Sequence, residues 1–345
     1  MTDKNSFQQK SVSSLLGGDE RGALKWGILS TAIIAREAMI PAMQKSKHSE
    51  LVAVASRDIK KAEKAAEEFG IKKAYGSYES LLADDEVEAV YIPLPNHMHV
   101  EWSLKALQAG KHVLVEKPVA LNSQEAEYLK KESEKYPDLK IMEAFMYRFH
   151  PQWVKVKELV RSGAIGELKN IQSLFSFFDD DPSSIVNSKE YGGGSLMDIG
   201  CYPISLSRFL FEEEPENVIS EIEFHPEFGT DVLATGIMKF RKGVSSFFSS
   251  TLLAEDQSVK IFGTEAFIEM PRPFNPDPDE ASEIVIVKDE TREVISFEPC
   301  DQYTLEVDAF SLAVLNNEPV PTPLTDAVNN MKVIEQLIGF AKGKS

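Results

Sequence analysis

The chain has 345 residues, 43% of them hydrophobic, a length that predicts about two domains, each with its own core. Its formal net charge of -18 argues against nucleic acid or an anionic membrane as a partner, so a site for a phosphorylated ligand would need its own cations. Two cysteines are too few for a disulfide framework or a cysteine-based metal site, and they fit a reducing, cytoplasmic compartment.

The first 23 residues are polar and lack the apolar core that defines a signal peptide. We expect residues 1–23 to form a flexible N-terminal arm. No later apolar stretch approaches the length of about 20 residues that a membrane-spanning helix needs, so no membrane segment is expected.

Short apolar runs and helical patterns alternate between residues 24 and 148. The runs have the length of buried strands and cover residues 25–29, 51–56, 89–92, 112–115 and 140–144. The helical patterns cover residues 33–43, 59–69, 99–109 and 123–135, the last of them opened by a capping box of Asn122 and Glu125. This alternation predicts an α/β Rossmann domain, a doubly wound parallel sheet with helices on both faces.

Residues 149–345 follow a different pattern. Helical periodicity appears near residues 153–161, 203–210, 303–315 and 324–340. Alternating runs, typical of antiparallel strands with one solvated face, cover residues 168–178, 245–252 and 284–287. Gly263-Thr264 indicates a hairpin turn, and the proline-rich residues 271–278 indicate a surface loop. We therefore predict an α+β domain with a large mixed or antiparallel sheet.

The turn after the first strand is a degenerate dinucleotide-binding motif. A Rossmann fold places Gly-x-Gly-x-x-Gly or Ala here, so that backbone amides can approach a pyrophosphate at a helix N-terminus. This chain has small residues in place of the two leading glycines, in the segment Ser30-Thr31-Ala32-Ile33-Ile34-Ala35. An ordinary strand–helix turn is the alternative, but its position on the first of five strands favours a cofactor site.

The residues after the second strand favour NADP over NAD. An acidic residue there would bind the ribose 2′-hydroxyl of NAD, whereas this chain has Ser56 and Arg57, with Lys61 one turn further on. A hydroxyl, a guanidinium and an ammonium suit a 2′-phosphate, and the forked guanidinium matches the dianion. The alternative is that Arg57 and Lys61 only decorate the start of an exposed helix.

The third strand leads into a loop that contains two histidines. His97 and His99 have no carboxylate or third histidine at ligand spacing, so we expect no metal site. We interpret Leu94, Pro95 and Asn96 as a rigid loop over a bound cofactor, with His99 in the first turn of the next helix. Simple helix capping by Asn96 is the alternative.

The tripeptide Glu116-Lys117-Pro118 ends the fourth strand with two opposite charges. They lie at the carboxyl edge of the predicted sheet, where open α/β sheets bind ligands. A lysine beside a bound ligand can polarise a reacting oxygen or hold a neighbour in the required charge state. A salt-bridged surface turn is the alternative.

A glycine-rich segment, residues 192–194, leads into Asp198 and Tyr202, which are four residues apart. On a helix these two side chains share a face, and a carboxylate beside a phenol suits proton transfer to a hydroxyl or a carbonyl. The alternative is a helix cap followed by a half-buried tyrosine. We interpret Cys201 as a small core residue rather than a nucleophile.

Together these motifs closely resemble the glucose-fructose oxidoreductase / inositol dehydrogenase (Gfo/Idh/MocA) family, from about residue 24 to near the C-terminus. The resemblance rests on Glu116-Lys117-Pro118, Pro95-Asn96-x-x-His99, the segment Glu-Ala-Phe-Met-Tyr-Arg-Phe-His-Pro at 143–151, and Gly192-Gly193-Gly194-x-Leu196-x-Asp198-x-Gly200-x-Tyr202. Within the family, the chain looks most like the NADP-dependent xylose or glucose dehydrogenases and the dimeric trans-dihydrodiol dehydrogenases.

The resemblance implies that Lys117 is catalytic, that Tyr202 occupies the proton-transfer position and that Asp198 lies beside it. It also implies a sugar, polyol or diol substrate, and a homodimer or homotetramer formed through the second sheet. Arg148 and His150 are expected to shape the pocket near the nicotinamide. With NADP as the expected cofactor, the predicted cofactor-binding residues are Ser30, Thr31, Ala32, Ile33, Ile34, Ser56, Arg57, Lys61, Leu94, Pro95, Asn96, His99, Glu116, Lys117 and Arg148.

Two other functions fit the same residues. A reductase of a keto-sugar, including a nucleotide-linked one from deoxysugar biosynthesis, would use them in the reverse direction. A non-catalytic sensor that binds a dinucleotide would fit the degenerate glycines, but the intact set of Lys117, Asp198 and Tyr202 argues against it.

Overall fold

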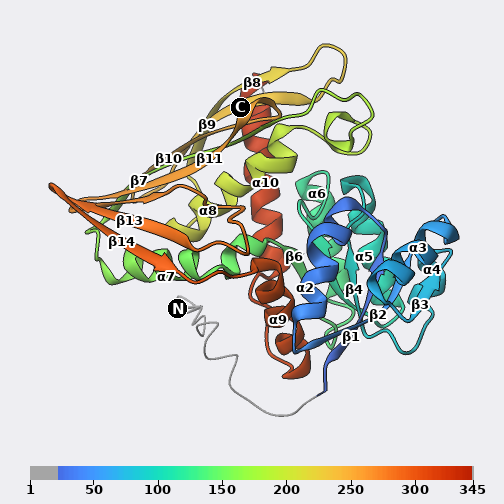
Figure 1. The fold of residues 1–345 in the computed structure, drawn as a ribbon. Helices are drawn as coiled ribbons and strands as arrows, with labels where there is room; N and C mark the ends of the chain where they lie inside the picture. Colours follow the sequence, from blue (N-terminus) through green and yellow to red (C-terminus); the bar gives the residue numbers. More distant parts are fainter. Residues whose placement is uncertain (1–21, 344–345) are drawn as a thin grey trace, which may run out of the picture.

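The computed structural model describes residues 22–343, and their first part forms a six-stranded parallel sheet (Figure 1). The strands lie in the order β3-β2-β1-β4-β5-β6, and the order reverses between β1 and β4. An open α/β sheet binds ligands at such a reversal, beyond the carboxyl ends of its strands. The bounds are β1 (Leu24–Leu29), β2 (Ser49–Ala55), β3 (Lys73–Tyr75), β4 (Ala89–Ile92), β5 (His112–Glu116) and β6 (Ile141–Ala144). The predicted doubly wound sheet is confirmed.

Helices cover both faces of this sheet, and each face has its own cluster of buried apolar residues. Their bounds are η1 (Ala35–Met39), α2 (Ile40–Lys45), α3 (Ile59–Phe69), α4 (Tyr78–Leu82), η2 (Asn96–Met98), α5 (His99–Gln108), α6 (Ser123–Ser133) and η3 (Met146–Phe149). Two elements, β3 and α4, were not expected. β3 is an edge strand of three half-buried residues, and α4 is a single five-residue helix, so neither leaves a readable periodicity.

The helix predicted over residues 33–43 is present, and the chain is helical from residue 33 to residue 45, but its middle is a π-helix. The structure has the π-helix η1, followed by the α-helix α2. Pro41 lies at the start of α2 and has no N–H to donate to the carbonyl four residues earlier. Just before it, the amide of Ile40 donates to the carbonyl of Ala35, the i−5 spacing of a π-helix.

The second part of the chain forms an eight-stranded sheet in the order β14-β13-β12-β11-β7-β10-β9-β8. Only the β7–β10 pair is parallel, so the predicted mostly antiparallel sheet is confirmed. The turn predicted at Gly263-Thr264 joins β11 to β12. The bounds are β7 (Leu168–Phe178), β8 (Asn217–Phe224), β9 (Asp231–Lys239), β10 (Val244–Ser250), β11 (Leu252–Gly263), β12 (Phe267–Met270), β13 (Ser282–Lys288) and β14 (Thr291–Phe297).

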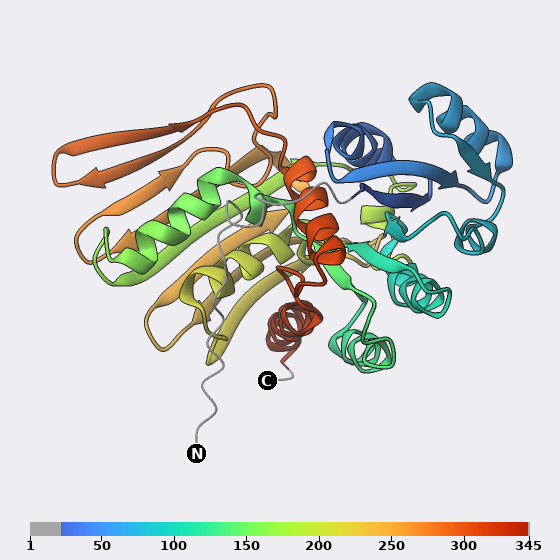
Figure 2. The same cartoon turned by 90° about the horizontal axis from the view of Figure 1, so that it is seen from below.

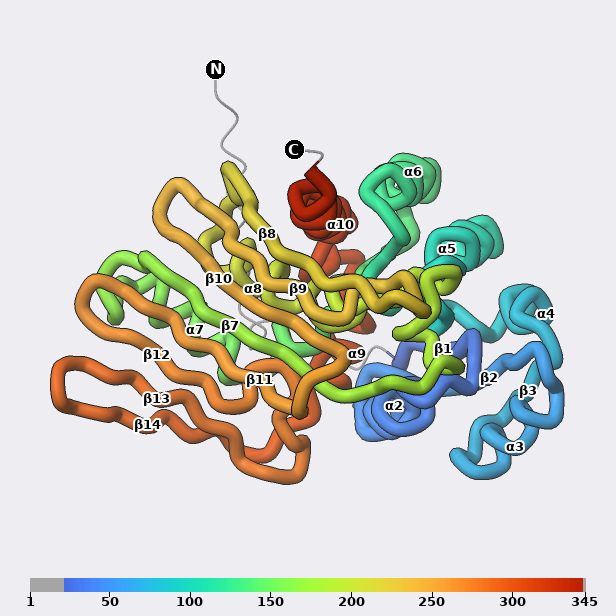
Figure 3. The backbone as a smooth tube through the Cα atoms, turned by 90° about the horizontal axis from the view of Figure 1, so that it is seen from above, coloured from blue at the N-terminus to red at the C-terminus, as the bar shows by residue number. Residues whose placement is uncertain are grey.

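One face of the large sheet is covered by helices and the other is open. α7 (Pro151–Ser162) and α8 (Cys201–Phe211) lie against the covered face, as the opposite views of Figure 2 and Figure 3 show. No helix of residues 22–343 lies on the other face (Figure 3). The short helices η4 (Ile185–Asn187) and η5 (Leu196–Gly200) lie on the connection from β7 to α8.

The last two helices connect the two sheets. α9 (Gln302–Leu315) contacts β1 and β2, and α10 (Leu324–Ala341) contacts α6 as well as α8 and β8 (Figure 1). The C-terminal helices therefore fix the edge of the first sheet against the second. A dinucleotide-binding domain at residues 24–148 and a substrate-binding domain at residues 149–345 remain our proposed division.

Within residues 22–343, no helix combines the length and apolar character that crossing a bilayer demands. The arm expected at residues 1–23 lies outside the described residues, apart from its last two.

Candidate active site

A cavity of about 1160 Å³ lies between the two sheets, beyond the carboxyl ends of β1, β4, β5 and β6. Pockets for ordinary small ligands measure about 300–1,000 Å³, so this cavity has room for a dinucleotide together with a small substrate. The sequence-predicted site residues that line it are Ala32, Ile33, Ile34, Leu94, Asn96, Glu116, Lys117, Asp198 and Tyr202.

Lys117 is bound directly to Asp198 in this cavity. Its Nζ donates to the backbone oxygen of Asp198 at 2.7 Å and to Oδ1 of the same residue at 3.1 Å. Burial opposes the ammonium charge, but the charge of Asp198 outweighs it, so the pKa of Lys117 lies above its ordinary value. Lys117 is therefore a fixed positive charge, and an ammonium has a third N–H for a ligand.

Tyr202 lies next to Lys117, at the boundary between the cavity and an aromatic core. The Lys117 Nζ is 5.2 Å from the centre of its ring. The Tyr202 hydroxyl donates to Met146 Sδ at 3.5 Å, a weak acceptor that a ligand oxygen could replace. Burial raises the pKa of Tyr202 well above its ordinary value, so the phenol is neutral.

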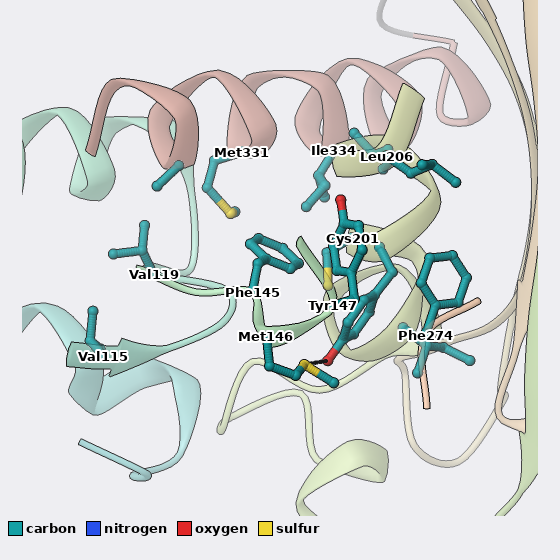
Figure 4. Close-up of a cluster of buried hydrophobic side chains, with 14 of the residues drawn as sticks. Val115, Val119, Phe145, Met146, Tyr147, Cys201, Leu206, Phe274, Met331 and Ile334 are labelled. Atoms are coloured by element: carbon teal, nitrogen blue, oxygen red, sulfur yellow. Dashed lines mark hydrogen bonds between the residues drawn. The ribbon is translucent and has the colours of Figure 1, made fainter. Parts of the chain in front are cut away.

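The core behind Tyr202 holds this site rigidly. The rings of Phe145, Tyr147, Phe175 and Phe274 all lie within 6 Å of the Tyr202 ring, centre to centre. Figure 4 shows Phe145, Tyr147 and Phe274 packed together below the helix that carries Met331 and Ile334. Residues from η3, the large sheet and α10 therefore meet behind the cavity.

Glu116 precedes Lys117 and is turned toward the sheet. Its Oε1 accepts a hydrogen bond from the hydroxyl of Tyr91, and its Oε2 accepts one from the Lys117 amide at 3.2 Å. Burial raises the pKa of Glu116, although Lys117 and the Tyr91 hydroxyl partly offset that rise.

The loop after β1 keeps the shape of a glycine turn without its glycines. Ser30 has φ +141°, a left-handed backbone that favours glycine, and its Oγ accepts a hydrogen bond from the Ala32 amide at 3.1 Å. Ala32 is not among the positive-φ residues of the described chain, so its side chain causes no backbone strain. Thr31 lies between them, outside the cavity lining.

Ser56 and Arg57 lie beside this loop, because Leu29 pairs with Ala55 where β1 and β2 end. The buried hydroxyl of Tyr78 interacts with the side chains of both Ser30 and Arg57, which links the two turns. Arg57 and Lys61 are exposed and do not line the main cavity. Two cations at the end of β2 suit a phosphate on the far end of a dinucleotide.

His99 lies behind the cavity rather than in its wall. Its Nδ1 is 2.8 Å from the carbonyl oxygen of Pro118 and its Nε2 is 2.6 Å from that of Leu94. Burial lowers the pKa of His99 to about 4, so the neutral ring donates to one of these oxygens at a time. His99 thus ties the loop after β4 to the loop after β5. Pro95 also lies outside the lining.

Asn96 joins the loop after β4 to the glycine-rich segment. Its Nδ2 donates to the backbone oxygen of Gly192 at 2.9 Å, and the rings of His97 and Tyr191 stack at 5.2 Å. These contacts bring residues of the two predicted domains together over the cavity. The N-cap position of η2 is held by Pro95, so the Asn96 side chain joins the two segments rather than capping that helix.

Arg148 also lies away from the cavity. Its guanidinium donates to Ser205 Oγ at 2.7 Å and pairs with Asp326 of α10 at 2.8 Å. Burial lowers the pKa of Arg148, but the charge of Asp326 raises it by more, so this pKa lies above its ordinary value. His150 caps α7, where its Nδ1 accepts from the Gln152 amide. Both residues therefore position η3 rather than contact the cavity.

The contribution of α9 to the cavity wall was not predicted from the sequence. Tyr303 and Glu306 line the cavity next to Glu116 and Lys117, and Glu306 is completely buried. A signal was present, because Glu306 lies four residues from Gln302 and from Phe310, on the buried face of the helix. The wall formed by Phe175 and Phe177 of β7 and by Arg272 and Asn275 after β12 was not predicted, whereas Ile185 and Val186 lie in the loop at residues 179–191 that was expected to shape the pocket.

Asp231 supports the helix that carries Asp198. Its Oδ2 accepts a hydrogen bond from the Leu196 amide at 2.7 Å, at the start of η5. Gly194 makes this contact possible: it has φ +118°, and a Cβ there would lie 2.2 Å from Asp231 Oδ1. The glycine-rich segment is thus a close approach of backbone to a buried carboxylate.

Gly194→Ala is expected to destabilise the protein more than an ordinary left-handed glycine substitution would. The strain of a left-handed alanine costs about 1–2 kcal/mol, and loss of a hydrogen bond to a buried carboxylate adds about 1–3 kcal/mol. Chemical denaturation would measure the difference. Gly229→Ala is the matched control, because Gly229 has φ +67° and only Lys189 Cδ nearby, at 3.7 Å. Equal losses for both variants would show that the Asp231 contact contributes nothing.

The cavity fits a dinucleotide but offers no metal site. The left-handed Ser30 keeps the turn that brings backbone amides toward a pyrophosphate, and Arg57 with Lys61 supplies cations beyond it. The two oxygens of Glu306 lack hydrogen-bond partners beside the cavity, as expected for groups that a ligand would satisfy. Among the described residues, no group of three or more His, Cys, Asp or Glu side chains could hold a metal ion.

Comparison with known proteins identifies the fold family. Residues 24–143 match the family model described as an oxidoreductase family with an NAD-binding Rossmann fold, and residues 153–269 match the GFO/IDH/MocA C-terminal domain. A D-xylose 1-dehydrogenase (NADP(+)) from Haloferax volcanii is 38% identical, over 92% of this chain and 98% of the relative. A trans-1,2-dihydrobenzene-1,2-diol dehydrogenase from Xenopus laevis is 35% identical, over 72% and 76%.

A 3-ketoreductase from Actinomadura kijaniata, solved with NADP and TDP-benzene, superimposes with a TM-score of 0.86 at 28% identity. The match covers 92% of this chain and 97% of that one. The family and enzyme class expected from the motifs are confirmed. The chain belongs to the Gfo/Idh/MocA family of NAD(P)-binding oxidoreductases.

Proposed function

We propose that this protein is an NADP-dependent oxidoreductase that acts on a sugar hydroxyl or carbonyl, as an aldose 1-dehydrogenase or a trans-dihydrodiol dehydrogenase does. The observation that carries the proposal is the Lys117–Asp198 pair beside Tyr202, in a cavity at the carboxyl ends of the strands. The 38% identity to an NADP-dependent xylose dehydrogenase supports the substrate class.

In this proposal Tyr202 gives or takes the proton, and Lys117 stabilises the charge on the substrate oxygen. The substrate oxygen takes the place of Met146 Sδ as partner of the Tyr202 hydroxyl. The third N–H of Lys117 reaches the same oxygen and stabilises negative charge as it develops there. The positive charge of Lys117 would also lower the pKa of Tyr202, which burial otherwise raises. Asp198 holds the ammonium in place, and a bound nicotinamide would supply or accept the hydride.

The charges in the cavity favour an uncharged sugar over a nucleotide-linked one. Among the described residues that line it, the only Lys and Arg are Lys117 and Arg272, and the second sheet also contributes Glu255 and Asp256. A nucleotide-linked substrate carries a diphosphate, which acidic side chains repel. A reductase acting on such a substrate, as the similar 3-ketoreductase structure suggests, is therefore the second candidate.

The test is a substrate screen with the intact protein. D-xylose, D-glucose and a trans-dihydrodiol are each incubated with NADP, and a dTDP-linked keto-sugar with NADPH, while the absorbance of NADPH is followed. Turnover of a free sugar or diol would support the proposal, and turnover of the nucleotide-linked sugar alone would favour the second candidate. Cofactor binding without any turnover would favour a sensor.

We also propose that two copies associate through the open face of the large sheet, in a reducing compartment such as the cytoplasm, where Cys201 and Cys300 stay unpaired. Ile219 and Ile237 are paired across β8 and β9 and are 47% and 42% exposed. An exposed apolar patch on an uncovered sheet is typical of an interface.

Ile237→Lys is expected to dissociate this dimer, because a charge would be buried at the interface. Light scattering after size exclusion would show the mass of a dimer for the parent chain and of a monomer for the variant. A monomeric parent chain would contradict the proposal.

A further inference from the structure

Glu306 is a buried carboxyl whose presence the fold does not explain. It lies on α9 and has no exposed surface, and neither Oε1 nor Oε2 makes a hydrogen bond of normal geometry, although the Phe145 amide interacts with the carboxyl. Leaving such a group unpaired costs about 1–3 kcal/mol, which an apolar side chain of similar size would avoid. Unpaired buried polar groups beside a cavity are typical of sites that a ligand completes.

The surroundings of Glu306 keep its carboxyl neutral. Burial and the charge of Glu116 raise the pKa of Glu306 well above its ordinary value, and the Phe145 amide offsets only part of the rise. The nearby titratable groups also include Tyr303 on α9, Tyr91 on β4, Lys117 after β5, Asp198 on η5 and Tyr202 on α8. A neutral carboxyl has one O–H donor and one carbonyl acceptor.

The position of Glu306 indicates which part of a dinucleotide it would meet. Ser30 and Arg57 follow β1 and β2, in the half of the sheet that binds the adenosine side of a dinucleotide. Glu306 interacts instead with Glu116 and Phe145, which end β5 and follow β6 in the other half. A dinucleotide that spans the crevice therefore brings its nicotinamide to this side.

The nicotinamide carries a primary carboxamide, with one carbonyl acceptor and an N–H donor side by side. This pair of groups is complementary to a neutral carboxyl. A substrate hydroxyl is less suited, because a single hydroxyl does not present a carbonyl acceptor and an N–H donor side by side.

We propose that Glu306 is a cofactor-binding residue: its O–H donates to the carboxamide oxygen of the nicotinamide, and its carbonyl oxygen accepts from the carboxamide N–H. The inference rests on the proposed NADP-dependent function and adds the residue that recognises the nicotinamide end of the cofactor.

The experiment compares two cofactors on three variants. NADPH and its 3-acetylpyridine analogue, in which a methyl group replaces the amine, are titrated against the intact protein and its variants by calorimetry. Glu306→Leu should raise the Kd for NADPH by about tenfold, which corresponds to the loss of one buried hydrogen bond. The Kd for the analogue should rise by less. Glu306→Gln keeps a donor and an acceptor and should bind NADPH nearly as tightly as the parent chain.

Asp308→Asn is the matched control, since this carboxyl is on the same helix but binds Ser46 outside the cavity. Asp308→Asn should leave the affinity for both cofactors unchanged. Thermal unfolding without cofactor gives a second measurement: Glu306→Leu should raise Tm, because it removes an unpaired buried carboxyl, whereas a purely structural role predicts a lower Tm.

Unchanged NADPH affinity in Glu306→Leu, or equal losses for NADPH and the analogue, would overturn the inference. Weaker substrate binding by Glu306→Leu, with unchanged NADPH affinity, would also overturn the inference. If the parent chain binds no NADPH at all, the proposed function itself is wrong. If the parent chain binds NADPH but the Glu306 variants do not change its affinity, only the inference about Glu306 is wrong.

Discussion

Lys117→Met is expected to lower kcat by about 10²–10⁴-fold while NADPH affinity stays within a few-fold of the parent value. The expected range is that of a positioned acid, base or charge lost from a transition state. Lys117 is fixed by two bonds to Asp198, so methionine removes the ammonium without removing the binding surface for the rest of the cofactor. Steady-state kinetics and a separate NADPH titration would measure the two effects.

Two further variants separate catalysis from folding. Lys157→Met is the matched control, because the Lys157 side chain is 11% exposed against 15% for Lys117 but pairs with Glu212 outside the cavity. Lys117→Met leaves Asp198 unpaired and partly buried, which destabilises the fold. Adding Asp198→Asn should restore stability but not turnover. Near-normal kcat in Lys117→Met would contradict the proposed role.

Arg57→Ala is expected to raise the Kd for NADPH by about 10- to 100-fold and to change the Kd for NADH little. A hydrogen bond to a charged phosphate is worth about 1.5–3 kcal/mol, and NADH has a hydroxyl where NADPH has the phosphate. The guanidinium lies near the Tyr78 hydroxyl, which also interacts with Ser30 of the neighbouring turn.

The control for this prediction is Lys64→Ala, because Lys64 is an exposed lysine on helix α3, just after Arg57 and about one turn beyond Lys61. General loss of positive charge would affect both variants alike. Equal losses of NADPH and NADH affinity in Arg57→Ala would refute a 2′-phosphate site at the end of β2.

The sequence predicted the first sheet well because buried parallel strands are apolar along their whole length. The run at residues 112–115 lies within β5, and the run at 89–92 coincides with β4. Edge strands escaped this signal, since β3 has no buried residue. In the second sheet, β7 matched residues 168–178, whereas β8 and β14 are edge strands with few buried residues.

Site residues that follow a strand were placed by topology, because parallel strands end at one edge of the sheet. Lys117 lies there at the end of β5, whereas Asp198 reaches it from η5 in the second part of the chain, 81 residues away. His99 and Arg148 were expected at the cofactor, but the structure buries both behind the cavity, where they bond to Leu94, Pro118 and Asp326. A motif indicates that a residue matters and does not indicate which way its side chain points.

The packing of α9 against the first sheet could not be predicted from the sequence. Its helical period was readable, but the partner of its buried face is set by the packing of elements nearly 300 residues apart, such as Trp26 and Phe310. Glu306 therefore seemed an ordinary helix residue until the fold placed it beside Glu116.

The most direct test of the proposed NADP-dependent function is a titration of the intact protein with NADPH and, in parallel, with NADH. Both cofactors should bind, with NADPH at least tenfold tighter because of Arg57 and its neighbours. Tighter binding of NADH, or no binding of either cofactor, would contradict the account. The second result would mean that Ser30 and Ala32 disable the phosphate turn.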